Sequence, residues 1–121
     1  MTANVATPWS TVGYLTYKRT YSRRLDEDNT EEFPQTVERV ISSCKDQLNV
    51  GFTEYEESRL REYLLKLKGS VAGRFWWQMG TKTVDRLGLA SLQNCAFTVV
   101  DNPIVPFTWT MDMLALGAGV G

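Results

Sequence analysis

Residues 91–100 read SLQNCAFTVV, and the second half of this stretch, CAFTVV at 95–100, carries the clearest strand signal in the sequence. Its side chains are apolar or β-branched, and turn-forming residues flank it, with Asn94 before it and the Asp-Asn-Pro sequence of 101–103 after it. A short continuous apolar run between turn signals is typical of a buried strand. We therefore predict one largely buried strand at 95–100, which begins with the thiol of Cys95.

A helix and a glycine loop are expected after this strand. Phe107, Met111 and Leu114 recur at helical spacing, which predicts a helix over 107–116 that packs through these side chains. Residues 117–121, GAGVG, then form a glycine-rich loop of the kind that delivers a chain into its next strand. Together these elements predict an α/β fold that is incomplete in this chain.

Two amphipathic helices are predicted before the strand. The first has Pro34 in its first turn. Its buried stripe comprises Val37, Val40, Ile41, Cys44 and Leu48. The second begins at a capping box over 53–56 and ends near Gly69. From Ser70 onward the sequence SVAGRFWWQMGT is dense in glycine and aromatic residues, and the helical period is lost there. Its tryptophans are expected to fill a core or an interface.

The composition is that of an ordinary globular protein. Of the 121 residues, 43% are hydrophobic and 22% are charged, and 13 basic residues against 14 acidic ones leave a net charge of −1. The N-terminus lacks the features of a secretion signal, and no apolar run approaches the length of a membrane span. We expect a cytoplasmic protein with no membrane partner and no overall electrostatic attraction to nucleic acid.

The residue types that are present restrict the chemistry. The chain has no histidine, which excludes Ser-His-Asp and Cys-His catalysis and most zinc sites, so no metal site is expected. Its two cysteines, Cys44 and Cys95, are far apart in the sequence and lack CxxC spacing. In a reducing compartment we expect both to remain thiols.

Two places in the C-terminal half are candidate sites. Cys95 would present its thiol at the end of a strand, where α/β folds build binding sites, although a small core residue is the simpler interpretation of a buried cysteine. The amides of the loop at 117–121 are suited to wrap a phosphate or hydroxyl group, and a plain turn is the alternative.

A third candidate is the basic, tyrosine-rich segment 14–24, which is followed by the acidic run 26–32. The segment interleaves basic and aromatic side chains: Tyr14, Tyr17, Lys18, Arg19, Tyr21, Arg23 and Arg24. Such a composition occurs on nucleic-acid-binding surfaces. We expect the acidic run to form an exposed loop that neutralises much of this charge, and we favour a solvated or ion-paired surface. A non-catalytic module that binds nucleic acid or protein through 14–24 remains the alternative function.

Four segments, in this order, resemble the N-terminal portion of the adenosylcobalamin-dependent (class II) ribonucleotide reductases, especially the monomeric ribonucleoside-triphosphate reductase type. They are GYLTYKRTYSRRL at 13–25, SVAGRFWWQMGT at 70–81, SLQNCAFTVV at 91–100 and FTWTMDMLALGAGVG at 107–121. The resemblance implies a ten-stranded α/β barrel preceded by a mainly helical region. Residues 1–69 are then the helical region, and residues 70–121 contain the first strand and helix of the barrel and the glycine loop that leads into its second strand.

The resemblance also implies a chemistry and a set of site residues. A thiyl radical would abstract the 3′ hydrogen of a ribonucleotide, and a pair of cysteines would supply two electrons as the 2′ hydroxyl leaves as water. Cys95 matches the first cysteine of that pair, and its partner lies outside this chain. Ser70 and Gly119 match substrate-contacting positions, and the backbone of Asn94 would lie beside the substrate. Cys44 receives no role.

The resemblance finally implies cofactors and partners. Adenosylcobalamin would generate the radical and be bound mostly by parts that this chain lacks, with diiron-dependent radical generation as the alternative. The expected partners are the C-terminal remainder of the reductase, a ribonucleotide and a thioredoxin-like reductant, with no direct contact to nucleic acid. The choice between di- and triphosphate and the allosteric effector stay open. The chain alone is expected to be inactive.

Overall fold

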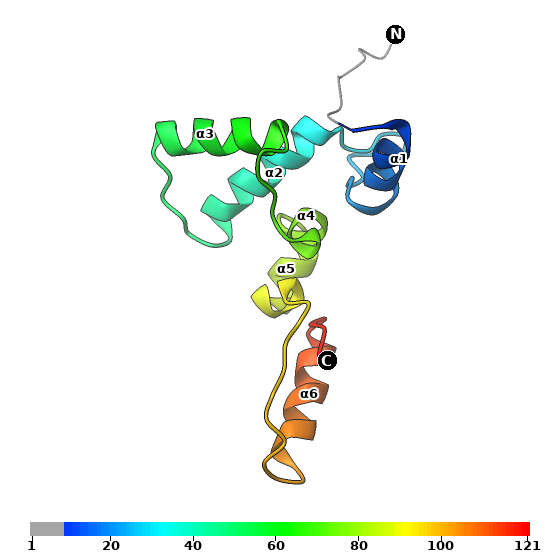
Figure 1. Cartoon of the computed structure of the whole chain (residues 1–121), viewed down its shortest axis with the longest axis vertical. Coiled ribbons are helices and arrows are strands. Elements are labelled where there is room, and N and C mark those ends of the chain that lie inside the picture. Colours follow the sequence, from blue (N-terminus) through cyan, green and yellow to red (C-terminus); the bar gives the residue numbers. More distant parts are fainter. Residues whose placement is uncertain (1–8) are drawn as a thin grey trace. The chain divides into compact units, whose positions relative to one another are not determined.

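The computed structural model describes residues 9–121, which are mainly helical (Figure 1). The helices are α1 Thr11–Thr20, α2 Phe33–Asp46, α3 Glu54–Leu65, α4 Gly73–Gln78, α5 Lys82–Leu87, the 3-10 helix η1 Leu89–Leu92, and α6 Val105–Ala115. The chain divides into two compact units, an N-terminal unit that ends at Gly80 and a C-terminal unit that spans Thr81–Gly121. The expected division after residue 69, which separates the helical region from the reductase barrel, stays a prediction.

The two helices predicted for the N-terminal unit are present as α2 and α3, with corrections at their C-terminal ends. α2 ends at Asp46, so Leu48 lies beyond it, and Cys44 on the predicted buried stripe is only half-buried. α3 ends at Leu65 and not near Gly69. A capping box joins Glu32 and Gln35 at the start of α2, and Pro34 lies in its first turn. The predicted capping box begins α3. There the amide of Glu56 donates to the hydroxyl of Thr53 at 3.2 Å, and the amide of Thr53 donates to the carboxylate of Glu56 at 2.9 Å. These side chains satisfy backbone donors that the first turn of a helix leaves unpaired.

An aromatic cluster forms the centre of the N-terminal unit. The ring centroid of Phe33 lies 4.5 Å from that of Trp9, 5.7 Å from that of Tyr17 and 5.8 Å from that of Trp76. Phe33 thereby joins α1, α2 and α4. The core continues along α2 with its buried aliphatic residues Val37, Val40 and Ile41.

Four helices were not predicted from the sequence: α1, α4, α5 and the short 3-10 helix η1. α1 overlaps the basic, tyrosine-rich segment 14–24, and only Tyr17 of this helix is buried. One buried position gives no apolar period to detect. α4 and α5 are six residues long each, so neither spans two turns, and both fall in the region where the helical period is lost.

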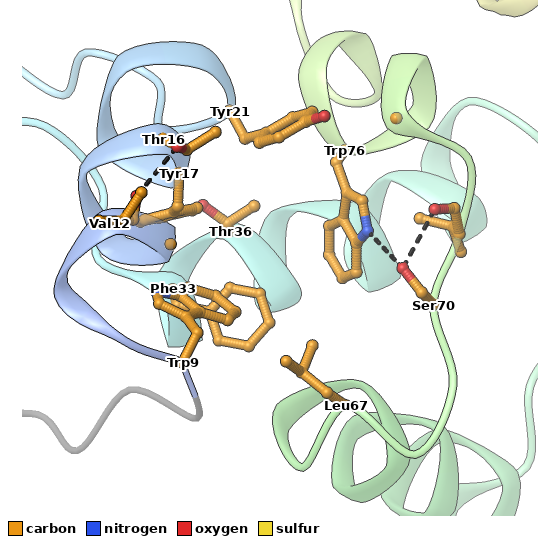
Figure 2. A pocket seen from close by; sticks show the side chains of 13 residues that line it. Trp9, Val12, Thr16, Tyr17, Tyr21, Phe33, Thr36, Leu67, Ser70 and Trp76 are labelled. Carbon is orange, nitrogen blue, oxygen red and sulfur yellow. Dashed lines mark hydrogen bonds between the residues drawn. The ribbon is translucent and has the colours of Figure 1, made fainter.

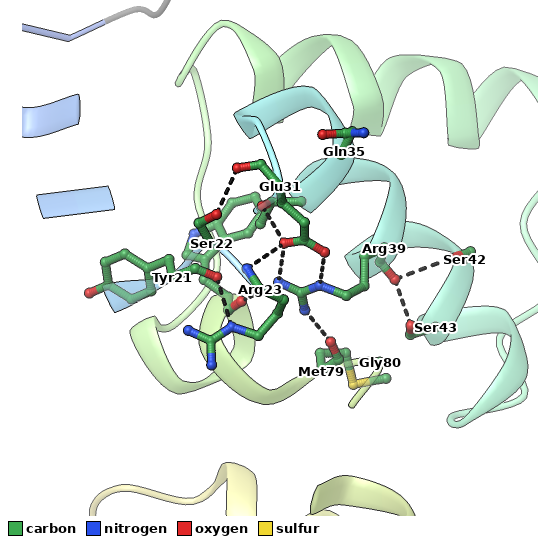
Figure 3. Close-up of polar contacts among 12 residues, drawn as sticks. Tyr21, Ser22, Arg23, Glu31, Gln35, Arg39, Ser42, Ser43, Met79 and Gly80 are labelled. Atoms are coloured by element: carbon green, nitrogen blue, oxygen red, sulfur yellow. Dashed lines mark hydrogen bonds and ion pairs between the residues drawn. The ribbon is translucent and has the colours of Figure 1, made fainter. Parts of the chain in front are cut away.

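The prediction that the acidic run 26–32 is exposed is wrong at Glu31, which is only 3% exposed. Its carboxylate accepts hydrogen bonds from Nε of Arg39 at 2.8 Å, from Oγ1 of Thr36 at 2.7 Å and from the amide of Arg23 at 3.1 Å. Figure 3 shows Arg39 and Arg23 beside this carboxylate. A carboxylate is buried only where such partners replace its hydration. We call this group of Glu31, Thr36, Arg39 and the Arg23 amide the Glu31 cluster.

In the C-terminal unit, the backbone at 93–96 pairs with the backbone at 119–121. The amide of Ala96 donates to the carbonyl of Gly119 at 2.9 Å, and the amide of Gly121 donates to the carbonyl of Ala96 at 3.2 Å. These bonds make a parallel bridge between Ala96 and Val120. Because α6 connects the two paired segments, the order is extended segment, helix, extended segment.

The strand predicted at 95–100 is wrong for this structure, in which Ala96 alone forms a bridge within that range. Phe97, Val99 and Val100 are 77%, 70% and 69% exposed, although we expected them to be buried. A strand needs neighbouring strands to bond its backbone groups. Residues 119–121 offer a partner that is too short, so the α/β class is not reached within the described residues.

The helix expected over 107–116 is present as α6 and begins at Val105. The side chain of Asn102 accepts hydrogen bonds from the amides of Ile104 and Val105, which lie at this earlier start. The expected packing face is wrong, because Phe107, Met111 and Leu114 are all exposed.

No helix among the described residues combines the length and apolar character needed to cross a membrane.

Candidate functional site

Asn94, Cys95 and Gly119 lie close together in the C-terminal unit. The amide of Gly119 donates to the carbonyl of Gln93 at 3.0 Å, and the carbonyl of Gly119 accepts from the amide of Ala96 at 2.9 Å. Gly119 is therefore bonded to the residues on either side of the Asn94–Cys95 peptide. The structure thus brings together three of the predicted site residues.

The pairing requires a glycine at position 119. A Cβ atom added there would overlap the carbonyl oxygen of Asn94 and lie 3.1 Å from its carbonyl carbon. Both obstructing atoms belong to the backbone, which cannot move aside as a flexible side chain can. Glycine is selected here for close backbone approach.

We expect Gly119→Ala to break this pairing. The overlap should cost about 1–3 kcal/mol, the usual penalty for overpacking. It should weaken the hydrogen bonds between residues 93–96 and residues 119–121. Amide hydrogen exchange on the full chain measures this weakening, because the amide of Ala96 should exchange faster in the variant than in the wild-type chain. The matched control is Gly121→Ala, because a Cβ at Gly121 would meet nothing within 4 Å. Equal exchange in both variants would contradict the close approach.

The two thiols have different surroundings. Cys95 is exposed, whereas Cys44 is half-buried on α2, and both are free thiols. Burial raises the pKa of the Cys44 thiol, which lowers the fraction present as the reactive thiolate. Exposure therefore favours Cys95 as a thiol that exchanges with a partner, and burial disfavours Cys44 in that role.

Ser70 belongs to the N-terminal unit, where it is exposed and lines a pocket of about 470 Å³ (Figure 2). The pocket walls are largely aromatic, formed by Trp9, Tyr17, Tyr21, Phe33 and Trp76. Its size and apolar character are those of small-molecule sites. The Nε1 of Trp76 donates to the Oγ of Ser70 at 3.0 Å, so the serine hydroxyl has a fixed partner at the pocket wall.

The basic, tyrosine-rich segment 14–24 is engaged within the chain. Lys18 pairs with Glu32 at 2.8 Å, and the guanidinium of Arg24 donates to the carbonyl of Glu27 at 2.8 Å. Tyr17 is buried with its hydroxyl 2.7 Å from that of Thr36, and burial raises the pKa of Tyr17 to about 12. The interpretation of this segment as an ion-paired surface is supported, and the interaction module is not favoured.

Sequence reasoning missed the polar role of Trp76 and the whole of the Glu31 cluster. Trp76 was assigned to packing alone, although a buried indole N–H usually finds an acceptor, and a serine six positions earlier is a candidate. Arg39 bonds to Glu31 and also donates from Nη2 to the carbonyl of Trp76 at 2.9 Å. Nothing in the residue spacing pairs Arg39 with either partner.

Comparison with known proteins assigns the family. The profile of the ribonucleotide reductase alpha domain matches residues 1–81. A putative adenosylcobalamin-dependent ribonucleoside-triphosphate reductase of Mycobacterium phage D29 is 36% identical over 94% of this chain and 16% of its own length. The adenosylcobalamin-dependent ribonucleoside-triphosphate reductase of Lactobacillus leichmannii is 33% identical over 98% of this chain and 20% of its own length.

A third relative, a probable adenosylcobalamin-dependent ribonucleoside-triphosphate reductase of Dictyostelium discoideum, is 29% identical over 91% of this chain and 17% of its own length. No solved structure matches the chain. The chain spans about a fifth or less of the length of these curated relatives, between 16% and 20%. The alpha-domain profile, by contrast, covers well over half of the chain. The chain therefore belongs to the ribonucleotide reductase alpha domain family.

Proposed function

We propose that this chain is the N-terminal part of an adenosylcobalamin-dependent ribonucleoside-triphosphate reductase and that Cys95 is one of its two reducing thiols. The observation that carries the proposal is the pairing of 93–96 with 119–121, which holds an exposed Cys95 beside Gly119. The family match and the names of the relatives supply the reaction. Those names also favour a triphosphate substrate, and they give no support to diiron-dependent radical generation.

The proposed role of Cys95 is a two-electron reduction. Its thiol and a second cysteine thiol, supplied by another part of the reductase, form one disulfide and give up two electrons and two protons. The ribose carbon gains a hydrogen in place of its 2′ hydroxyl, which leaves as water. A thioredoxin-like dithiol in the cytoplasm would then reduce the disulfide, and the exposure of Cys95 suits that exchange.

The substrate contacts follow from the same assignment. The backbone of Asn94 and Gly119 would lie beside the nucleotide, and the hydroxyl of Ser70 would contact it. Gly119 suits this role because its lack of a side chain already permits one close backbone approach.

We expect adenosylcobalamin to be bound mostly by parts of the reductase that this chain lacks. The described residues contain no group of three or more side chains that could hold a bare metal ion. Because the corrin ring carries the cobalt, its binding does not require such a group. The roles proposed here for Cys95, Asn94 and Gly119 are reduction of the substrate and contact with it.

The partner that this proposal requires is the remainder of the reductase, and the C-terminal unit has a surface suited to receive it. Seven of its apolar side chains are 60% exposed or more: Phe97, Val99, Val100, Ile104, Val105, Phe107 and Met111. None of the amides of 97–100 donates a hydrogen bond to another described residue. Exposed apolar patches next to unpaired extended backbone mark interaction sites.

Reconstitution tests the proposed function. The chain is co-expressed with the C-terminal remainder of the phage D29 relative, which begins where the match to this chain ends. We expect reduction of ribonucleoside triphosphates that requires both polypeptides, adenosylcobalamin and a dithiol. The matched control is the phage enzyme itself split at the same position. An active split control together with an inactive mixture would refute the proposal.

A further inference from the structure

The hydroxyl group of Ser70 has two hydrogen bonds of unequal quality. It accepts from the indole Nε1 of Trp76 at 3.0 Å, and it donates to the carbonyl of Val71 at 3.2 Å (Figure 2). The first bond has an ordinary length. The second is long for a bond donated by a hydroxyl, which usually measures about 2.7–2.8 Å, and its acceptor is the neighbouring residue. The hydrogen bond that Ser70 accepts is therefore well formed, and the hydrogen bond that it donates is weak.

This asymmetry follows from the chemistry of the two groups. An indole N–H donates and never accepts, so Ser70 must receive that bond through an oxygen lone pair. An exposed serine hydroxyl otherwise rotates freely among its staggered positions. Because Trp76 occupies one lone pair of Ser70, the O–H of Ser70 can donate its hydrogen bond to a better acceptor than the carbonyl of Val71.

Trp76 is itself held rigidly in the N-terminal unit. It is 8% exposed, and its ring lies 5.8 Å from that of Phe33. Its carbonyl accepts from Nη2 of Arg39 at 2.9 Å, and Nη1 of Arg39 also donates to the carbonyl of Met79 (Figure 3). Arg39 in turn is fixed by Glu31 at 2.8 Å. The Glu31 cluster thus anchors the end of α4, and α4 anchors the indole that orients Ser70.

We propose that Trp76 is a positioning residue that fixes the hydroxyl of Ser70 as a donor to an acceptor oxygen of the nucleotide substrate. The inference rests on the proposed function, because it takes Ser70 as a substrate contact. It adds that the contact depends on an indole N–H that does not touch substrate. On substrate binding, the O–H of Ser70 rotates, so that it donates its hydrogen bond to the nucleotide in place of the carbonyl of Val71, while the bond from Trp76 is unchanged.

The hydrogen bond is tested on the full chain without any activity. The sequence has four tryptophans, each of which gives one indole N–H signal in a nitrogen–proton NMR spectrum. We expect Ser70→Ala to shift the signal of Trp76 and to leave those of Trp77 and Trp109 in place. Ser70→Thr keeps the hydroxyl, so in this variant the signal of Trp76 should lie near its wild-type position. A Trp76 signal that is unmoved by Ser70→Ala overturns the inference whether or not the reductase assembly is active.

The positioning role is tested in the reconstituted reductase. Trp76→Phe keeps an aromatic ring and removes the N–H, and we expect KM for the nucleotide to rise about tenfold, the value of one hydrogen bond, with kcat nearly unchanged. Ser70→Ala should have the same effect, and the double variant should be no worse than either. Trp77→Phe is the matched control, because Trp77 is 42% exposed.

Each outcome of these assays has a distinct meaning. Additive effects of Ser70→Ala and Trp76→Phe, or a loss of kcat with KM unchanged, would assign Trp76 to packing alone and overturn the positioning role. An equal rise in KM for Trp77→Phe would also overturn the positioning role of Trp76. Inactivity of the wild-type mixture beside an active split control counts against the proposed function, and the NMR result then stands by itself.

Discussion

Cys95→Ser is expected to abolish nucleotide reduction in the reconstituted reductase. A serine hydroxyl cannot form a disulfide, so the two electrons that replace the 2′ hydroxyl by hydrogen have no source. The loss should be on the order of a thousandfold or more in kcat, as for other residues that take part in covalent chemistry. The measurement is the rate of deoxyribonucleotide formation with a dithiol as reductant.

Cys44→Ser is the matched control for this prediction. It makes the same change of sulfur to oxygen at the other free cysteine of the chain. Because Cys44 is half-buried on α2 and burial raises the pKa of its thiol, we expect reduction to continue at nearly the wild-type rate. Activity that survives Cys95→Ser, or that is lost equally in both variants, would contradict the assignment of Cys95.

A single turnover adds a sharper test of the same prediction. The wild-type assembly without added dithiol should make no more than one deoxyribonucleotide per active site, and Cys95 should then be inaccessible to thiol-labelling reagents because it is in a disulfide. Without substrate, the exposed thiol of Cys95 should label readily. Full labelling after turnover would mean that Cys95 is not oxidised in the reaction.

The sequence predicted those parts of the structure whose causes are local. The capping box at Thr53 and Glu56 forms because the two residues lie one helical turn apart, so their spacing is sufficient to predict it. The apolar stripe of α2 is likewise a property of that helix alone. The family resemblance implied that Gly119 and Asn94 each lie beside the substrate, but the close approach of their backbones, which requires the glycine, is seen only in the structure.

The errors arise where a structure depends on partners far away in the chain. The composition of residues 95–100 suits a strand, but a strand forms only beside other strands, and of these residues only Ala96 forms a bridge, to Val120. Glu31 stands in an acidic run that any local rule places in solvent. It is buried because Arg39, Thr36 and the amide of Arg23 converge on it, and this convergence is not visible in sequence spacing.

Glu31→Gln should strongly destabilise the N-terminal unit. The substitution leaves Arg39, whose side chain is 12% exposed, without its counter-charge, and removal of one member of a buried ion pair costs about 3–5 kcal/mol. That loss is comparable with the whole stability of a small domain, about 5 kcal/mol at the lower end of the usual range. Urea denaturation of the full chain, followed by circular dichroism, measures the change in the free energy of unfolding.

Glu27→Gln provides the matched control for Glu31→Gln. It makes the same chemical change in the same acidic run at an exposed residue, where the cost should stay within about 0.5 kcal/mol. A double variant, Glu31→Gln with Arg39→Met, should be less destabilised than the sum of the two single variants, because it leaves no unpaired buried charge. Additive losses would mean that the two residues do not act as a pair.

The pH dependence of stability distinguishes the ion pair from simple packing. Burial alone would raise the pKa of Glu31, but hydrogen bonds from Arg39, Thr36 and the Arg23 amide, with the charge of Arg39, hold it below its ordinary value of 4.5. A carboxyl whose pKa is lowered by folding stabilises the folded state fully above pH 4.5 and progressively less as the pH falls through its folded pKa. The wild-type chain should therefore lose more stability than Glu31→Gln on acidification below pH 4.5. Parallel losses in the two chains would show that the charge of Glu31 does not stabilise the fold.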